Sequence, residues 1–163
     1  MAKTIANVLV GVALLEIKYP IGGSYVEVGY TEDGVSIEHT TDEADIDVEE
    51  ETYSLNSVIT KEATAVIVNM AEASLYNIDK AIPGSVLAGN IITVGSGANK
   101  EMSVKVTGTN PAGFNRTYEF PFCVSAGTLT LSHRKGEKTI VAARFKVLKP
   151  SGADPFKITD STS

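Results

Sequence analysis

The chain of 163 residues contains a single cysteine, Cys123, two histidines and no tryptophan. One cysteine cannot form an internal disulfide, which indicates a reducing compartment and excludes a fold held together by a cysteine framework. Two histidines and one cysteine, far apart in the sequence, are too few ligands for a zinc site. We therefore expect neither a metal nor any other cofactor.

Basic residues are also scarce, with 14 Lys and Arg against 20 Asp and Glu and a formal net charge of -6. This balance argues against a protein that wraps nucleic acid, which needs clustered Lys and Arg to displace counterions. The negative charge is compatible with DNA that passes nearby without binding, because like charges repel. No stretch approaches the roughly 20 apolar residues of a membrane helix. Residues 8–15 (VLVGVALL) faintly resemble a signal peptide, but Glu16 and Lys18 follow at once, so we expect a first strand there.

Motifs for catalysis are missing from the sequence as well. No G-x-S-x-G motif occurs, and the Gly95-Ser-Gly97 segment lacks the strand-to-helix context of a phosphate loop. His39 lies beside an acidic run and His133 begins a basic turn, where solvated side chains are expected. An open acidic run does not set two carboxyl pKa values apart. We expect no catalytic residues and no enzyme.

The most informative stretch is Thr60 to Ile82. Its first part, Ala63 to Met70, is an apolar run rich in β-branched residues, which predicts a strand covered on both faces. From Ala71 the apolar period changes, which predicts a helix over about 71–82 with one apolar face made of Ala71, Leu75, Ile78 and Ile82. Glu72 would lie in its first turn, and Pro83-Gly84 would end it.

Strands and turns account for the rest, so we predict one mainly β domain over residues 1–150, a β-sandwich or barrel with one flanking helix, and a polar tail over 151–163. Residues 1–6 would be a loose arm, and Thr31–Gly34 a hairpin turn. Residues 85–100 would be a long loop or weak strands, and Pro121 would mark an edge strand or a bulge. Strands are expected over residues 7–19, 25–30, 35–39, 52–59, 102–107, 118–122, 128–133 and 139–149, with inward-facing Tyr118, Phe120, Phe122, Val141, Ala143, Phe145 and Val147.

The strangest composition is residues 42–51 (DEADIDVEEE), which hold seven acids and no base. In an extended conformation one face would carry Asp45, Asp47, Glu49 and Glu51, and the other Ala44, Ile46 and Val48. Three interpretations stay open: a solvated strand edge or loop, a calcium loop, and a negatively charged surface with a function. The calcium loop is the weakest, because the EF-hand spacing is absent.

Four segments, in order, resemble the tail tube (major tail) proteins of long-tailed bacteriophages. They are the stretch 23–35, similar to an early hairpin, the acidic strand 46–50, the strand-to-helix step 60–82, and the closing strands 116–121 and 138–149. In the third segment Met70-Ala71-Glu72 stands where the family has leucine, alanine and glutamate. The stretch 84–100 has no counterpart that we recognise.

The resemblance implies a structural subunit of the virion, made in the bacterial host cytoplasm, that assembles into hexameric rings stacked into a tube. The tape measure protein and then the transiting DNA would occupy the lumen, and tail-tip and tail-terminator proteins would bind the ends. An acidic lumen would repel DNA phosphates. Candidate lumen-facing acids are Asp45, Asp47, Glu49 and Glu51, and candidate contacts between subunits or rings are Glu50, Thr52, Tyr53, Val66, Val68 and Met70.

Two rival interpretations come from the residues alone. A monomeric β-sandwich binding module, of a carbohydrate-binding or adhesin type, would need an exposed aromatic platform, yet the sequence has no Trp and its aromatic strand at 118–122 looks core-facing. A small-ligand β-barrel, or an enzyme built on one, is the other, and a soluble, monodisperse monomer with a deep apolar pocket would favour it.

Overall fold

The computed structural model describes residues 11, 13–95 and 97–162. The predicted N-terminal arm and most of the first half of the predicted strand 7–19 lie outside these residues. The described part contains one helix, α1 (Leu75–Ala81). Its ten strands are β1 (Leu14–Lys18), β2 (Tyr25–Glu27), β3 (Thr31–Ile46), β4 (Asn56–Met70), β5 (Val86–Ala88), β6 (Ile91–Thr93), β7 (Glu101–Thr109), β8 (Asn115–Ser125), β9 (Val141–Val147) and β10 (Lys157–Asp160).

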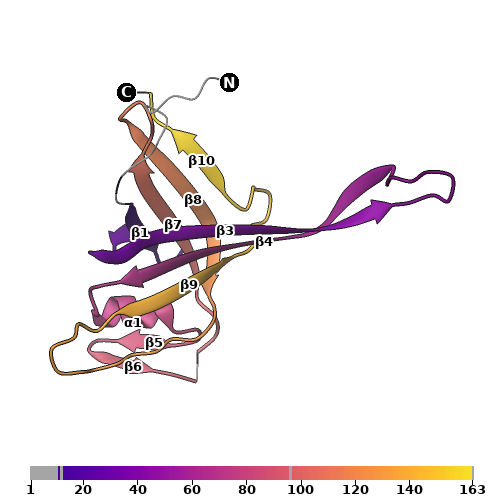
Figure 1. The fold of residues 1–163 in the computed structure, drawn as a ribbon. Coiled ribbons are helices and arrows are strands. Elements are labelled where there is room, and N and C mark those ends of the chain that lie inside the picture. The colour runs from indigo at the N-terminus through magenta and orange to yellow at the C-terminus, as the bar shows by residue number, and fades with distance from the viewer. Residues whose placement is uncertain (1–10, 12, 96, 163) are drawn as a thin grey trace.

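One antiparallel sheet, in the order β2-β1-β7-β8-β9-β4-β3, folds back on itself at β8 (Figure 1). One edge of β8 pairs with β7; the other pairs first with β10, at Arg116–Glu119, and then with β9, at Cys123–Ser125. The β7 pairing moves two residues, Val104 to Met102, while β8 moves three, Phe120 to Cys123. This irregularity includes Pro121, as predicted, and it bends the strand. The predicted β-sandwich-like fold with one helix is confirmed.

The core lies between the two halves of this sheet and is made of alternate residues on facing strands. Phe120 of β8 and Phe145 of β9 are its largest members, and both are fully buried. The predicted inward positions of the last long strand are confirmed, because its buried residues alternate with exposed ones. The remaining core residues on the strands are Leu15, Ile17, Val66, Val68, Met70, Met102, Val104, Val106, Cys123, Val141, Ala143 and Val147.

The predicted hairpin turn at Thr31–Gly34 is wrong. These residues lie inside β3, and β2 pairs with β1 rather than with β3. Asp33 (φ 58°) and Gly34 (φ 75°) form a bulge, since the pairing with β4 jumps from Glu32–Asn69 to Val35–Val68. The left-handed conformations that suit a tight turn also suit a bulge. The choice between the two depended on which strand became the partner.

Helix α1 is shorter than predicted, and its most deeply buried residues are mainly polar. It begins after Ser74, whose hydroxyl accepts a hydrogen bond from the Asn77 amide (3.2 Å), so Glu72 lies before it. The buried residues are Asn77, Asp79, Lys80 and Ala81, whereas Leu75 is 41% exposed. The predicted apolar face is therefore only partly correct: Ile78 packs against the core, but Leu75 is exposed and polar groups with partners elsewhere in the chain are the most deeply buried.

Three further segments differ from or refine the predictions. The predicted strand 128–133 is irregular, and only Leu129 packs against the core there. The glycine-rich stretch 85–100 does contain weak strands, the hairpin β5–β6. The segment after Pro150 carries β10, which pairs with β8, and its Phe156 stacks on Phe120 with ring centroids 5.6 Å apart.

Candidate assembly interface

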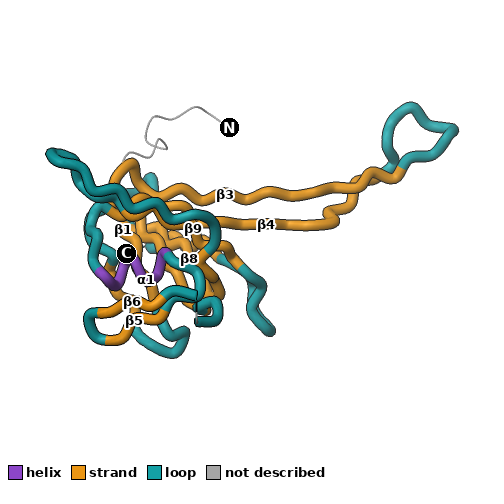
Figure 2. The backbone as a smooth tube through the Cα atoms, turned by 90° about the horizontal axis from the view of Figure 1, so that it is seen from below, coloured by secondary structure: helices purple, strands orange, loops and turns teal. Residues whose placement is uncertain are grey.

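A long hairpin arm leaves the body of the molecule (Figure 2). We define the arm as residues 40–63, the ends of β3 and β4 with the loop between them. Every residue in this range is exposed. Toward the body β4 becomes buried from Thr64 onward, while β3 becomes at most half-buried.

The pairing of its two strands and a few side-chain hydrogen bonds hold the arm together. The pairing runs from Thr40–Ala63 to Ile46–Asn56, and Thr60 is bulged out beyond the pair Asp42–Lys61. The Thr60 hydroxyl donates a hydrogen bond to the Asp42 carbonyl (3.1 Å), and the Leu55 amide donates to the Ile46 carbonyl (2.8 Å). A two-stranded hairpin with both faces in water is marginally stable by itself. Within one protomer the arm is therefore held by its own hydrogen bonds and not by packing on the body.

The end of the arm exposes large apolar side chains among the acids. Tyr53 is 87% exposed and Leu55 61%. Fully burying one such side chain stabilises a complex by roughly 1.5–3 kcal/mol. The exposed large apolar residues of the arm are Ile46, Val48, Tyr53, Leu55, Val58 and Ile59. A patch of this kind at the end of an extended element is typical of a protein–protein contact.

The four candidate lumen acids all lie on the arm. Asp45 is in β3, opposite Ser57, while Asp47, Glu49 and Glu51 are in the loop 47–55. The strand alternation used to group them ends at Ile46, so the structure gives the loop acids no common strand face. The apolar alternation holds as far as the strand does, since Ala44 and Ile46 pair with Val58 and Asn56.

The six candidate contact residues fall in two places. Glu50, Thr52 and Tyr53 lie in the exposed loop of the arm. Val66, Val68 and Met70 lie in the core of the protomer and are at most 1% exposed. The side chains of these three are covered by their own chain, so the contacts proposed below rest on the arm.

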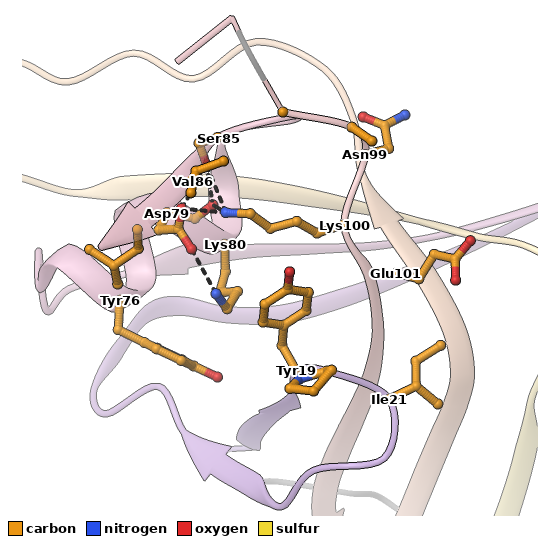
Figure 3. Close-up of a pocket in the computed structure, with 14 residues that line it drawn as sticks. Tyr19, Ile21, Tyr76, Asp79, Lys80, Ser85, Val86, Asn99, Lys100 and Glu101 are labelled. Atoms are coloured by element: carbon orange, nitrogen blue, oxygen red, sulfur yellow. Dashed lines mark hydrogen bonds and ion pairs between the residues drawn. The ribbon is translucent and has the colours of Figure 1, made fainter. Parts of the chain in front are cut away.

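A second feature, a buried ion cluster, was not anticipated from the sequence (Figure 3). Asp79 of α1 is 1% exposed and Lys80 3%. The Asp79 carboxylate accepts hydrogen bonds from Lys80 (2.7 Å), from Lys100 and from the Ser85 hydroxyl (2.8 Å). The Lys80 ammonium also lies over the ring of Tyr19, 4.2 Å from its centroid, where cation–π attraction stabilises it.

The pKa values in the cluster follow from burial and pairing together. Burial alone would raise the pKa of Asp79, but the hydrogen bonds from Lys100, Lys80 and Ser85 outweigh it and lower the pKa. Burial lowers the pKa of Lys100, and its contact with Asp79 offsets only part of this effect. Asp79 therefore stays ionised and holds both lysines in place.

The ion cluster joins segments that are distant in the sequence. Lys100 comes just before β7, and it also donates to the Asp79 carbonyl (3.0 Å) and to the Ser85 hydroxyl (2.8 Å). Ser125 at the end of β8 donates to the Lys80 carbonyl. These bonds fix α1 against β7 and β8. No local pattern reveals them, because Lys80 also suits a solvated last helical turn and Lys100 follows a glycine-rich stretch.

In the described part of the chain, no group of three or more His, Cys, Asp or Glu side chains is placed to hold a metal ion. The helix found there is too short to span a membrane.

Comparisons with known proteins find a similarity in the fold of the chain. No family model matches it, and no curated protein does. Among solved structures it matches a chain of the cryo-EM structure of the anti-feeding prophage baseplate, symmetrised six-fold, with a TM-score of 0.57 and 9% identity. The match covers 98% of this chain and 97% of that one. Over nearly its whole length, this chain shares the fold of a component of a prophage baseplate structure.

Proposed function

We propose that this protein is a structural subunit of a phage-type tail, and specifically a tail tube subunit that forms hexameric rings stacked into a hollow conduit for DNA. The observation that carries the proposal is the arm, an exposed two-stranded hairpin with apolar side chains at its end. Such an element is stabilised only when a neighbour covers it. The similar fold of a chain in a six-fold baseplate structure supports the same type of assembly.

The sheet also ends in a strand suited to joining. β3 is the last strand of its sheet, and within the described residues only β4 pairs with it. An open edge of this length is an aggregation hazard in a monomer. In a ring, a strand or loop of the adjacent subunit would cover it, and a contact that repeats by rotation closes on itself.

The acids of the arm have two possible roles in such a tube. They would either line the lumen and repel the DNA phosphates, or lie at a contact with a neighbouring subunit. The apolar side chains between them favour the contact, because a surface that only repels DNA has no need of Ile46, Tyr53 or Leu55. The tape measure protein and the DNA would pass along the lumen, and tail-tip and tail-terminator proteins would close the ends.

The test is electron microscopy and sedimentation of the purified protein at high concentration, with and without a tail-tip complex as a seed. We expect rings or tubes of uniform diameter. The matched control replaces residues 44–58 with Asn-Gly, a two-residue turn that joins the paired Glu43 and Ile59. This variant should keep the circular dichroism of the body and form no tubes. If the full chain stays a compact monomer with the seed present, the proposal is wrong and a binding module becomes the better interpretation.

A charge-reversal variant separates the two roles of the acids. With Asp45→Lys, Asp47→Lys and Glu49→Lys together, a lumen role predicts that tubes assemble and that DNA ejection slows. A contact role predicts that assembly itself falls. Ejection assays and sedimentation of the same preparation distinguish them, and if neither property changes, both roles are excluded for these three residues.

A further inference from the structure

A cleft of about 660 Å³ opens above the ion cluster (Figure 3). Its walls come from the turn after β1, from α1, from the start of β5 and from residues 97–101. They combine apolar or aromatic side chains, with Tyr19, Ile21, Tyr76, Val86 and Leu87 among them, and the polar groups of the ion cluster. This volume lies within the range of well-formed binding sites.

The charge of the cleft is uneven. The three buried ions Asp79, Lys80 and Lys100 sum to one positive charge, located at the end of the cleft beside α1. Glu101 also lines the cleft, but Figure 3 shows its carboxylate at the other end, away from the lysines. An acidic group that enters near α1 therefore meets a positive field from the two lysines.

The cleft and the arm lie on different sides of the body. The views in Figures 1 and 2 agree that the arm leaves from one side, while α1 and the β5–β6 hairpin lie on the other. A protrusion and a cavity on separate faces make a head-to-tail contact, which closes into a ring or continues along a filament. A symmetric dimer would not use such a pair.

We propose that the cleft is the receptor for the arm of a second copy of this chain. The inference rests on the proposed function, which requires that copies assemble. Tyr53 and Leu55 of the incoming arm enter between the apolar walls, and Glu49 to Glu51 face the lysine end. The complementarity is both apolar and electrostatic: the arm holds seven acids and no base over residues 42–51, and the floor of the cleft has an excess positive charge.

Thiol cross-linking tests this pairing directly. A chain with Tyr53→Cys and Val86→Cys carries one thiol on the arm and one at the cleft, where Val86 is 46% exposed. Cys123 does not interfere, since it is buried and burial raises its pKa to about 12. In assembled protein treated with a short bis-maleimide, each copy links to two neighbours. We expect a ladder of multimers on a denaturing gel, whereas either single variant gives none.

The control pairs Tyr53→Cys with Ala112→Cys, an exposed position in the turn between β7 and β8. Figure 1 shows this turn at the end of the body away from α1. It should give no ladder. A ladder with Ala112→Cys and none with Val86→Cys would overturn the inference. Tubes seen by electron microscopy but no ladder with Val86→Cys would overturn it too and leave the proposed function standing. A seeded preparation that forms neither tubes nor cross-links would overturn both.

The electrostatic part has its own readout. Neutralising the arm with Glu49→Gln, Glu50→Gln and Glu51→Gln should reduce the yield of cross-linked multimers several-fold at low salt. In the chain that keeps these three acids, the yield of cross-linked multimers should fall to a similar extent when the salt concentration is raised toward 1 M, because salt screens the attraction. A yield that depends on neither change would overturn the assignment of these acids to the lysine end.

Discussion

The two ends of strand β4 lie in opposite environments within one protomer, one buried and one exposed. From Thr64 to Met70 the strand lies in the core, with Val66 and Met70 fully buried. From Asn56 to Ala63 every residue is exposed, although the strand continues and still pairs with β3. The paired strands thus extend the sheet into solvent, while apolar burial is confined to the body. The body is stabilised by its own core, and the arm has no core of its own within the protomer.

Substitutions in the core of the body should change the free energy of unfolding the most. Phe145→Ala removes a fully buried ring, and we expect the free energy of unfolding to fall by about 3–5 kcal/mol. The matched change in the arm, Ile59→Ala, should alter it by less than about 0.5 kcal/mol in unassembled protein. Urea denaturation of both variants below the assembly concentration measures the difference.

Phe145→Leu is the control, because it retains much of the buried volume and should cost clearly less than Phe145→Ala. Similar costs for Ile59→Ala and Phe145→Ala would show that the arm packs on its own body in solution. The comparison between arm and body would then fail.

Substitutions in the ion cluster should have the next largest effect on the free energy of unfolding. Asp79→Asn leaves two buried lysines without their counter-ion, and breaking a buried pair in this way costs about 3–5 kcal/mol. Because the pKa of Asp79 is lowered in the folded state, its contribution is complete above the pKa of the unfolded chain and disappears as the pH falls through the folded value. The unfolding free energies of the wild type and the variant should therefore converge in acid. Urea titrations from pH 7 downward measure this, and a difference that stays constant into the acid range would contradict it.

Much of the body follows from patterns in the sequence, and the reasons are local. Alternation identified the inward face of β9, and Pro121 marked the irregularity in β8, since both depend on neighbouring residues. The face of α1 could not be found in this way. Its buried Asp79 pairs with the adjacent Lys80 and with Lys100, which is far along the chain, and no local spacing points to Lys100.

The arm shows a different limit. Its acids and alternating apolar residues were visible in the sequence, but the same alternation suits a strand that lies on a body and one that leaves it. Asp33-Gly34 likewise suits a turn or a bulge. In both cases the outcome depends on which strand pairs with which, and that is decided by contacts distant in the sequence.

Hydrogen exchange should show the contrast with no mutation at all. In unassembled protein, amides of the arm between residues 41 and 62 should exchange with an opening free energy near zero, whereas those of Val66 to Met70 should approach the global value. Assembly should slow the exchange of the arm and leave that of the body unchanged. Slow exchange in the arm before assembly would mean that the hairpin is rigid alone, and the argument that it needs a partner would lose its physical basis.

The smallest effect is expected at β10, which lies between the two extremes. All four residues of this strand are exposed, as in the arm. A bidentate salt bridge nevertheless fixes the strand to β8, with Arg116 Nε and Nη2 donating to the two carboxylate oxygens of Asp160 (2.6 and 2.7 Å). Asp160→Asn should leave the global unfolding unchanged, because Phe156 still stacks on Phe120. Asp160→Asn should speed hydrogen exchange of the Ser161 amide, which donates to the Asn115 carbonyl (2.8 Å). Lys157→Gln breaks the exposed contact with Glu119 and should speed this exchange less. Equal rates in all three proteins would show that the Phe156 stack and the strand pairing fix β10 without help from its ion pairs.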